Sequence, residues 1–335
     1  MTISPEPSLL VAVSRRAGST CHLCGASTEP LYDHLRDQLF ASPGEWQLVR
    51  CVNRGCGLVA LDPLPTDGEL ARAYATYCTH VESQEVPEHP ERDGWARTAL
   101  HWVNWSLMRS TGVLAAQREL KLSCLEHVTP GLVLDVGCGN GDRLARLRRL
   151  GWEVVGQDVD ARAAEVAQQV HGLTVRVGPL ESLAFAPDSF DAVTMNHVIE
   201  HVRRPVELLA EAWRLLRPGG RLVCVTPNIV GLGARVFGRH WYGLDPPRHL
   251  HLFSCRTLEA LARGAGIPSA RCATSVAHSI SFALSSLEKR AARGGVIGDG
   301  TLPMRLVAAV FQLVVSAARV GWKAAGDECV LLATR

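Results

Sequence analysis

The sequence has no marked excess of charge of either sign and no long apolar run. Its 335 residues include 35 lysines and arginines against 33 aspartates and glutamates, a formal net charge of +2. This balance gives no overall attraction to nucleic acid or to a membrane surface, and no dense basic and aromatic stripe is present. The longest uncharged run of residues 277–326, Leu306–Ala318, has 13 residues, too short to span a bilayer. Residues 1–18 lack the apolar core of a signal peptide, so we expect a cytoplasmic protein.

The cysteines do not form the pattern of a disulfide framework. There are 11 of them, an odd number, they are scattered along the chain, and Cys138 lies inside a glycine loop. Four of them form two pairs, each followed by glycine: Cys21-x-x-Cys24 and Cys51-x4-Cys56. Two such pairs are what a tetrahedral four-cysteine zinc site requires, and four thiolates leave no open position for catalysis. We predict a structural zinc-ribbon-like module at residues 1–64; the alternative is four incidental thiols in a small β region.

The rest of the chain is organised around the stretch Leu132–Asp142, Leu-Val-Leu-Asp-Val-Gly-Cys-Gly-Asn-Gly-Asp. A short apolar run ends in an acid and is followed by glycines at alternate positions and a helical pattern. This indicates a buried strand, a tight turn and a helix N-terminus, where a ligand can press against bare backbone. The dinucleotide-binding fingerprint would need a glycine at position 142, which is Asp142 here.

The stretch resembles motif I of the class I S-adenosylmethionine (SAM) methyltransferases. Ser-Phe-Asp at 189–191 and Leu-Arg-Pro-Gly-Gly at 216–220 also resemble the family pattern, and the ordered set spans about 132–228. The resemblance implies a SAM site in which Asp135 faces the methionine amino group and Asp158, 23 residues further on, meets the ribose hydroxyls. Its full predicted set is Asp135, Gly137, Cys138, Gly139, Gly141, Asp158, Val159, Leu180, Glu181, Asn196 and His197.

The alternation of strands and helices from residue 131 predicts an α/β fold. With the resemblance, this becomes a Rossmann-like seven-stranded class I methyltransferase sheet whose last strand, 328–334, is antiparallel. We expect a helical lid or linker at 65–126, where Trp95, Trp102 and Trp105 follow a helical rhythm, and a SAM-binding domain at 127–335. A helical insertion is expected at about 277–326, and by default it packs on the domain or on a second subunit. The more specific alternative is a helix that lies on a membrane surface.

The segment 229–254 is predicted to be a long loop on the substrate side of the sheet. Its Pro-Arg-His-Leu run, at 247–250, is similar to one in small-molecule and sugar methyltransferases with an N-terminal cysteine ribbon. We predict His249 as the general base for an acceptor hydroxyl and Arg248 as a clamp for an acceptor anion. A loop-folding role for both has nearly equal weight.

A second cluster contains His197, Glu200 and His201, which can share one helical face. Two imidazoles and a carboxylate could bind a metal, and some quinone O-methyltransferases with a similar Glu-His-Val segment use a divalent metal there. Similar runs are widespread in methyltransferases without a metal, where they form the floor beneath the methionine moiety. We favour the floor interpretation and keep His201 as a reserve base.

The sequence therefore predicts a SAM-dependent methyltransferase with a structural zinc. The expected acceptor is a small molecule, with a hydroxyl of a sugar, lipid-linked glycan or secondary metabolite as the leading class. The alternatives are an RNA methyltransferase with a zinc-binding recognition module and a SAM-binding scaffold without catalysis. Nucleic acid is disfavoured as a partner by the charge balance, a homodimer is left open, and no transmembrane segment is expected.

Overall fold

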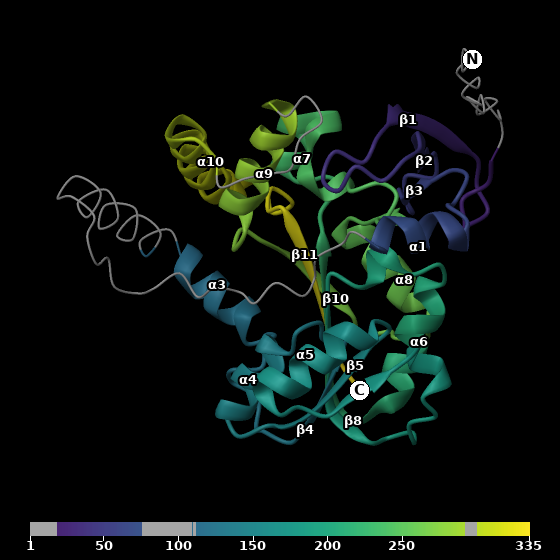
Figure 1. Ribbon diagram of the computed structural model, residues 1–335, viewed down its shortest axis with the longest axis vertical. Coiled ribbons are helices and arrows are strands. Elements are labelled where there is room, and N and C mark those ends of the chain that lie inside the picture. Colours follow the sequence, from purple (N-terminus) through teal and green to yellow (C-terminus); the bar gives the residue numbers. More distant parts are fainter. Residues whose placement is uncertain (1–18, 76–108, 110–111, 292–299) are drawn as a thin grey trace, which may run out of the picture.

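The computed structural model describes residues 19–75, 109, 112–291 and 300–335, and two β-sheets form its framework (Figure 1). The seven-stranded sheet has the order β10-β11-β8-β7-β4-β5-β6. Its strands are β4 (Leu132–Val136), β5 (Glu153–Asp158), β6 (Val175–Val177), β7 (Phe190–Asn196), β8 (Leu216–Pro227), β10 (Arg271–Ser275) and β11 (Glu328–Thr334). The predicted lid residues Trp95, Trp102 and Trp105 lie outside the described residues.

The predicted fold class is confirmed by the pairing in this sheet. Strands β6, β5, β4, β7 and β8 are parallel neighbours, and β11 runs antiparallel to both β8 and β10. Central strands are apolar on both faces, as in β4, because helices cover both sides. The carboxyl ends of the parallel strands share one edge, which is where ligands bind in open α/β sheets.

Two helical layers cover the seven-stranded sheet (Figure 1). One is formed by α4 (Asp142–Arg149) and α5 (Ala161–His171), and the other by α6 (Pro205–Leu215) and α8 (Cys255–Gly264). Each helix buries one apolar stripe, as in α6, whose buried face includes Leu208, Leu209, Ala212 and Leu215. Helix starts follow local capping chemistry: the Ser254 side chain accepts a hydrogen bond from the Thr257 amide at the start of α8.

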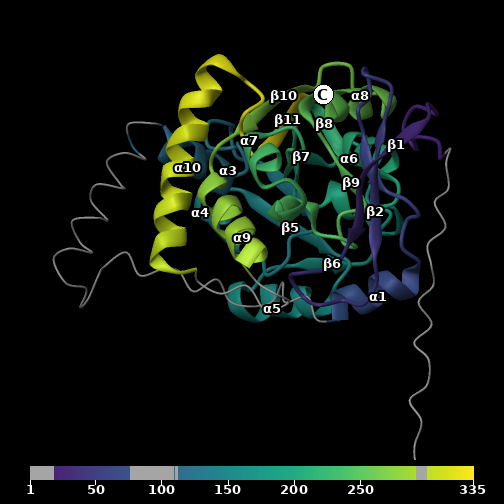
Figure 2. The ribbon, with the colours of Figure 1, turned by 90° about the horizontal axis from the view of Figure 1, so that it is seen from above.

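The second sheet joins the N-terminal segment to the C-terminal half of the chain. Its order is β1-β2-β3-β9, all antiparallel. The strands are β1 (Thr28–Leu35), β2 (Trp46–Cys51), β3 (Val59–Leu61) and β9 (His251–Leu252). Figure 2 shows β9 beside the N-terminal strands, and the Leu61 amide donates to the Leu250 carbonyl at 3.0 Å. The sheet of the N-terminal module is therefore completed by a strand that lies 190 residues further along the chain than β3 (251 − 61).

The segment predicted as a long loop, 229–254, is instead ordered. It contains α7 (Leu232–Phe237), two 3-10 turns and β9. Two of its aromatic residues, Phe237 and Trp241, are buried in a core that also holds residues of β2 and β3. The Asn228 side chain anchors the start of the segment by donating to the carbonyls of Ala324 and Gly326, at 3.0 and 2.7 Å. Burial of the two rings and the hydrogen bonds of Asn228 fix the backbone of the segment in one conformation.

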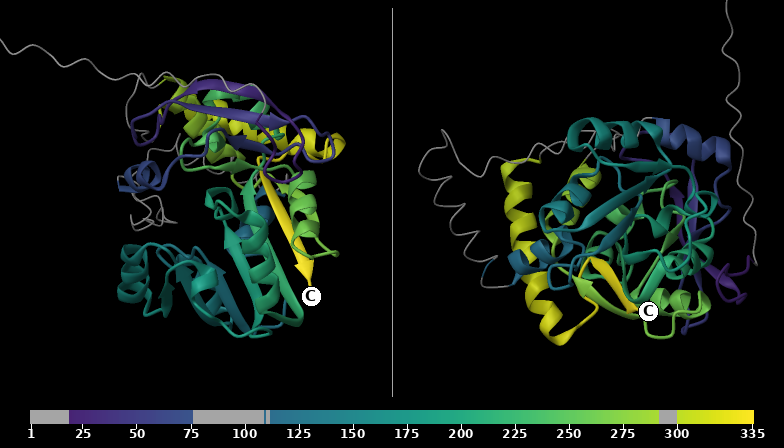
Figure 3. Two further views of the ribbon diagram at one scale, coloured as in Figure 1. Left: turned by 90° about the vertical axis from the view of Figure 1, so that its right-hand side faces the viewer. Right: turned by 90° about the horizontal axis from the view of Figure 1, so that it is seen from below.

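Residues 277–326 contain two helices, α9 (Ser279–Ala291) and α10 (Leu302–Gly321), between β10 and β11. Figures 2 and 3 show α10 along the outer side of α9. One face of α10 packs inward through Ala308, Phe311 and Val315. Its other face is apolar and exposed. In the described part of the chain α10 alone has the length and composition of a membrane-crossing helix, and 22% of its apolar window is buried. The remaining described helices are α1 (Asp67–Ala75) and α3 (Val113–Lys121).

Candidate active site

The glycine loop after β4 presents bare backbone at the carboxyl edge of the sheet. Gly137 and Gly139 have φ values of 65° and 55°, which L side chains rarely adopt. A Cβ on Gly137 would meet Val198 Cγ2 at 2.5 Å, whereas a Cβ on Gly139 would meet no atom within 4 Å. The Gly139 backbone therefore borders open space into which a ligand can press, and Gly137 is fixed against the segment that follows β7.

The other two loop positions contribute backbone only. The Cys138 side chain is 7% exposed and packs in the core, where burial raises the pKa of its thiol. Gly141 is the N-cap of α4, with φ of 82°. The first amides of α4 and the positive end of its dipole consequently face the same edge of the sheet as Gly139.

Asp135, the acid of this motif, carries an unsatisfied oxygen. It is fully buried in β4, and its Oδ1 accepts a hydrogen bond from Thr194 Oγ1 at 2.6 Å. Its Oδ2 has no hydrogen-bond partner, although Arg143 Nη1 lies 3.6 Å away. Burial raises the pKa of this carboxyl against the opposing effect of Arg143. A buried acceptor without a donor is costly, so this oxygen fits a ligand that brings an ammonium group to the end of β4.

Asp158 connects the end of β5 to the glycine loop. Its Oδ2 accepts from the Gly139 amide at 2.9 Å and its Oδ1 from the Asp160 amide at 2.9 Å. The carboxylate is thus held beside the open space at Gly139, and its remaining lone pairs can accept from hydroxyl groups.

The remaining residues of the predicted SAM site lie at or after the ends of β5, β6 and β7. Val159 is 69% exposed and Glu181 is exposed, so both side chains face solvent at this edge. Leu180 is 2% exposed and points into the core, which leaves only its backbone for a ligand. Asn196 is partly buried at the end of β7. Because β4, β5, β6 and β7 are parallel, the residues that follow them lie along one edge of the sheet.

His197 is partly buried and lies between two carboxylates. It has φ of 55°, and its Nδ1 lies 3.2 Å from Glu200 Oε1 while its Nε2 lies 3.0 Å from Glu328 Oε1. Burial disfavours the charge, but the hydrogen bonds to Glu200 and Glu328 outweigh it and raise the pKa of His197 to about 10. His278 Nδ1 also lies 3.0 Å from Glu328 Oε2. With both nitrogens protonated His197 has no lone pair, so it offers no metal ligand here.

Three other side chains come together instead: Glu200, His201 and His249. Their ligand-type atoms lie within 4.8 Å of one another, and the two imidazole centroids are 4.7 Å apart. His249 Nδ1 donates to the Gly243 carbonyl at 2.8 Å, whereas His201 Nδ1 lies 2.9 Å from Tyr74 Oη and 3.2 Å from the Arg248 carbonyl. Burial and the neighbouring His249 lower the pKa of His201 to about 4. Because its Nδ1–H is bound to a carbonyl, His249 has Nε2 as the nitrogen that can abstract a proton or bind a divalent cation.

Arg248 is placed differently from the prediction of an acceptor clamp. Its guanidinium is fully buried and donates to both carboxylates that flank it, to Asp37 at 2.8 and 2.9 Å and to Asp245 Oδ2 at 3.0 Å. Burial disfavours its charge, but these bonds raise the pKa of Arg248 well above its usual value. A guanidinium committed to two buried carboxylates has no donor exposed to an acceptor anion. Arg248 instead joins the N-terminal module to the His249 segment.

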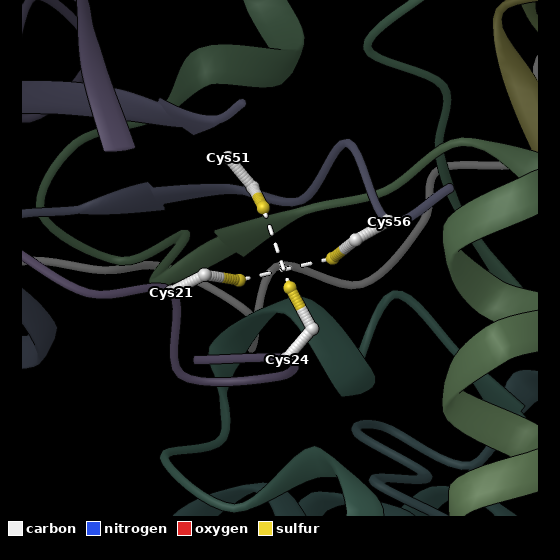
Figure 4. A group of neighbouring side chains, drawn as sticks. All are labelled: Cys21, Cys24, Cys51 and Cys56. Carbon is white, nitrogen blue, oxygen red and sulfur yellow. Dashed lines mark hydrogen bonds between the residues drawn. The ribbon is translucent and has the colours of Figure 1, made fainter. Parts of the chain in front are cut away.

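The four cysteines of the N-terminal module converge on one point (Figure 4). Cys21 Sγ lies 3.7 Å from Cys56 Sγ, and Cys24 Sγ lies 3.5 Å from Cys51 Sγ. Four sulfurs around a zinc ion at about 2.3 Å would be separated by about 3.8 Å, so the donor set and its geometry fit zinc. The glycines after the pairs, Gly25 and Gly57, have φ of 70° and 64°.

Several residues of the site carried no signal in the sequence. Tyr74 Oη lies 2.9 Å from His201 Nδ1, and Asp245 Oδ2 lies 4.0 Å from His249 Nε2. Glu328 and His278 come from the start of β11 and the entry to α9, and Asp37 from the N-terminal module. Glu328 could have been suspected as an acid opening an apolar strand, but nothing in the sequence connects it with His197, 131 residues earlier.

Comparison with known proteins identifies the larger part of this site. The profile of a methyltransferase domain family matches residues 111–267. Residues 111–267 therefore carry a methyltransferase domain, and the sheet described above has the class I methyltransferase fold. Outside this match lie the cysteine cluster and the helices α9 and α10.

The methyltransferase domain is similar to proteins named ubiquinone biosynthesis O-methyltransferase. The Cereibacter sphaeroides protein is 36% identical over 151 residues, 43% of this chain and 61% of its own length. The Roseobacter denitrificans protein is 42% identical over 136 residues, 38% of this chain and 54% of its own length. A Thermotoga maritima structure described as a SAM-dependent methyltransferase, possible histamine N-methyltransferase, is 22% identical, with a TM-score of 0.45, over 71% of this chain and 96% of that chain. The chain thus spans 54–61% of the length of these curated relatives.

Proposed function

We propose that this protein transfers the methyl group of SAM to a hydroxyl oxygen of a small molecule. The observation that carries the proposal is the adjacency of the glycine loop and the two imidazoles. Val198 fills the space beside Gly137, and Glu200 and His201 lie two and three residues after it in the chain. An electrophilic methyl group held at the loop would therefore face the imidazole pair. The relatives' name, O-methyltransferase, supports oxygen as the acceptor atom.

SAM, when bound, supplies a methyl group on a positively charged sulfur. Asp135 Oδ2 would accept from its amino group, Asp158 would accept from the ribose hydroxyls, and the Gly139 backbone would allow close approach. Val159 and Glu181 would flank the adenine, and most of the rate gain would come from positioning the two reactants.

His249 is the proposed general base. Its Nδ1–H is committed to a carbonyl, so Nε2 is the atom that takes the proton as charge develops on the acceptor oxygen. His201, whose Nδ1 lies between Tyr74 Oη and the Arg248 carbonyl, is the reserve base. A divalent cation held by Glu200, His201 and His249 is a second candidate, because two imidazoles and a carboxylate form a metal-type donor set.

The remaining proposals concern the whole chain. The four-cysteine module would hold one structural zinc ion, and a sugar, lipid-linked glycan or secondary metabolite is the proposed acceptor class. We keep residues 1–64, 65–126 and 127–335 as the proposed units, with the qualification that β9 of the third unit completes the sheet of the first.

The test uses tritium-labelled SAM, extracts fractionated for acceptors, and calorimetry of SAM binding. We expect low-micromolar SAM affinity, about −8 kcal/mol. His249→Ala should lower turnover by about 10²–10⁴-fold with SAM affinity little changed. His251→Ala is the matched control, since His251 is also buried but its ring centroid lies 6.0 Å from that of His22 in the N-terminal module.

The outcomes separate the alternatives. Loss of turnover in the His251 variant, with a normal rate in the His249 variant, would reject the base assignment. Activity that disappears with chelator and returns with magnesium or manganese would favour the cation. Absence of SAM binding in the wild-type protein would reject the proposed function itself.

A further inference from the structure

A second cluster of cysteines lies away from the zinc-type site. Cys255 is the first residue of α8, Cys272 is in β10 and Cys329 is in β11. Their Sγ atoms lie within 4.8 Å of one another. Cys272 and Cys329 share one face of the sheet, because Cys272 pairs with Leu331 and Cys329 with Thr274, a diagonal relation across the two strands. Helix α8 packs on that face and brings Cys255 to both.

The spacing of the sulfurs distinguishes between a shared metal and a covalent bond. Cys272 Sγ lies only 2.6 Å from Cys255 Sγ, and Cys329 Sγ lies 3.7 Å from Cys255 Sγ. A disulfide of about 2.05 Å needs the first pair to approach by about half an ångström. A zinc ion bound at about 2.3 Å to each sulfur needs the same pair to separate by about an ångström. The cluster is therefore closer to a disulfide than to a metal site.

Cys255 also has the environment of a reactive thiol. It lies in the first turn of a ten-residue helix, where amides and dipole favour a thiolate. The hydrogen bonds of Cys272 and then of Cys329 lower the pKa of Cys255 to about 5, against burial and the nearby Glu259 carboxylate. Cys255 and Cys272 are partly exposed, whereas Cys329 is fully buried, so a small oxidant can reach the first pair only.

We propose that Cys255 and Cys272 are a peroxide-sensitive thiol pair that closes to a disulfide between α8 and β10. The Cys255 thiolate attacks one oxygen of hydrogen peroxide, the O–O bond breaks, and hydroxide departs. Cys255 is then a sulfenic acid. The Cys272 sulfur then attacks Cys255 Sγ, the S–O bond breaks, and water leaves. The two thiols lose two electrons and two protons, and one peroxide becomes two waters.

The experiment maps the bond in the full-length protein with its metal bound. After peroxide treatment, free thiols are blocked with iodoacetamide and the chain is digested with trypsin without reductant. Cleavage after Arg248, Arg256, Arg271 and Lys289 places Cys255 in peptide 249–256 and Cys272 in peptide 272–289, apart from the zinc-type cysteines. We expect these two peptides to be joined, about 2 Da lighter than their sum, and to separate on reduction.

Variants assign the roles of the two sulfurs. Cys255→Ser should abolish the joined peptide, and Cys272→Ser should leave a sulfenic acid on Cys255 that dimedone traps. Cys329→Ser should still form the bond. Cys124 is the internal control, because burial raises the pKa of its thiol to about 12, and it should react at least tenfold more slowly.

Three results would overturn the proposal. The first is no joined peptide in the wild-type protein, a measurement that does not depend on any variant folding. The second is joining of Cys255 to the Cys329 peptide, 324–335, in place of Cys272. The third is a second, soft metal ion in each chain, in addition to the zinc of the four-cysteine module. Such an ion would be lost in Cys255→Ser and would protect the thiols from peroxide.

Discussion

Replacing Asp37 by alanine should destabilise the fold and slow catalysis while leaving the SAM site intact. Asp37 and Arg248 both have side chains that are 0% exposed, and two N–H groups of Arg248 donate to the carboxylate at 2.8 and 2.9 Å. The same carboxylate accepts from the amides of Leu39, Phe40 and Ser42. Removing one partner of such a buried pair costs about 3–5 kcal/mol, because the other charge stays buried.

At about 2–4 °C per kcal/mol, this loss corresponds to a fall of roughly 6–20 °C in the melting temperature. The Arg248 carbonyl orients His201, and His249 is the next residue, so both imidazoles should also shift. A displacement of about 1 Å at the base can lower turnover on the order of 100-fold. The SAM loops contact neither Asp37 nor Arg248 among the described hydrogen bonds, so SAM affinity should change less than twofold.

The assay combines differential scanning fluorimetry, calorimetry with SAM and the labelled-methyl assay. The matched control is Asp33→Ala, which removes an exposed acid of the same module and should shift stability by less than about 0.5 kcal/mol. Equal melting temperatures for the two variants would show that the buried pair does not hold the module in place. A loss of SAM binding in Asp37→Ala would contradict the separation of the two halves of the site.

Three further outcomes follow from the same structure. Gly139→Val should abolish SAM binding as measured by calorimetry. The valine side chain would enter the open space beside the loop, and the φ of 55° at this position disfavours a branched residue. An unchanged affinity would show that the loop is not part of the SAM site. Elemental analysis should find one zinc per chain, and chelation should lower turnover more than SAM affinity, because β3 pairs with β9 beside His249; a fully folded, zinc-free protein would count against the module. Burial raises the pKa of Asp327 from 3.8 to about 6, so its stabilising contribution is complete below pH 3.8 and is lost as the pH rises through 6. Between pH 4 and pH 8 the free energy of unfolding of Asp327→Asn, measured in urea, should therefore rise by about 3 kcal/mol relative to that of the wild type. A difference that does not change with pH would refute this.

The sequence alone predicted the elements whose causes are local. The run Leu132–Asp142 could only be a buried strand, a glycine turn and a helix start, because its period, its acid and its glycines act within eleven neighbouring residues. The same holds for the strand at 328–334 and for the two cysteine pairs. The seven-stranded sheet and the antiparallel direction of its last strand were implied by the resemblance of the ordered motifs to the class I methyltransferases.

The acceptor side of the site depended on tertiary structure. The segment 229–254 was predicted as a long loop on the substrate side, yet burial of Trp241 and pairing of β9 with β3 give it one conformation. The prediction that Arg248 clamps an acceptor assumed that its guanidinium is free to bind an anion. In the structure this guanidinium donates to the carboxylate of Asp37, which lies 211 residues away in the chain.

The pairing of the histidines has the same origin. The sequence placed His197 with Glu200 and His201 by their spacing, but the chain turns His197 toward Glu328 and brings His249 to His201. Hydrogen bonds between buried polar groups are chosen by which partners the packed sheets bring within about 3 Å. Residues that are far apart along the chain leave no periodic signal of such a contact, so only the tertiary structure decides which imidazole is charged and which keeps its lone pair.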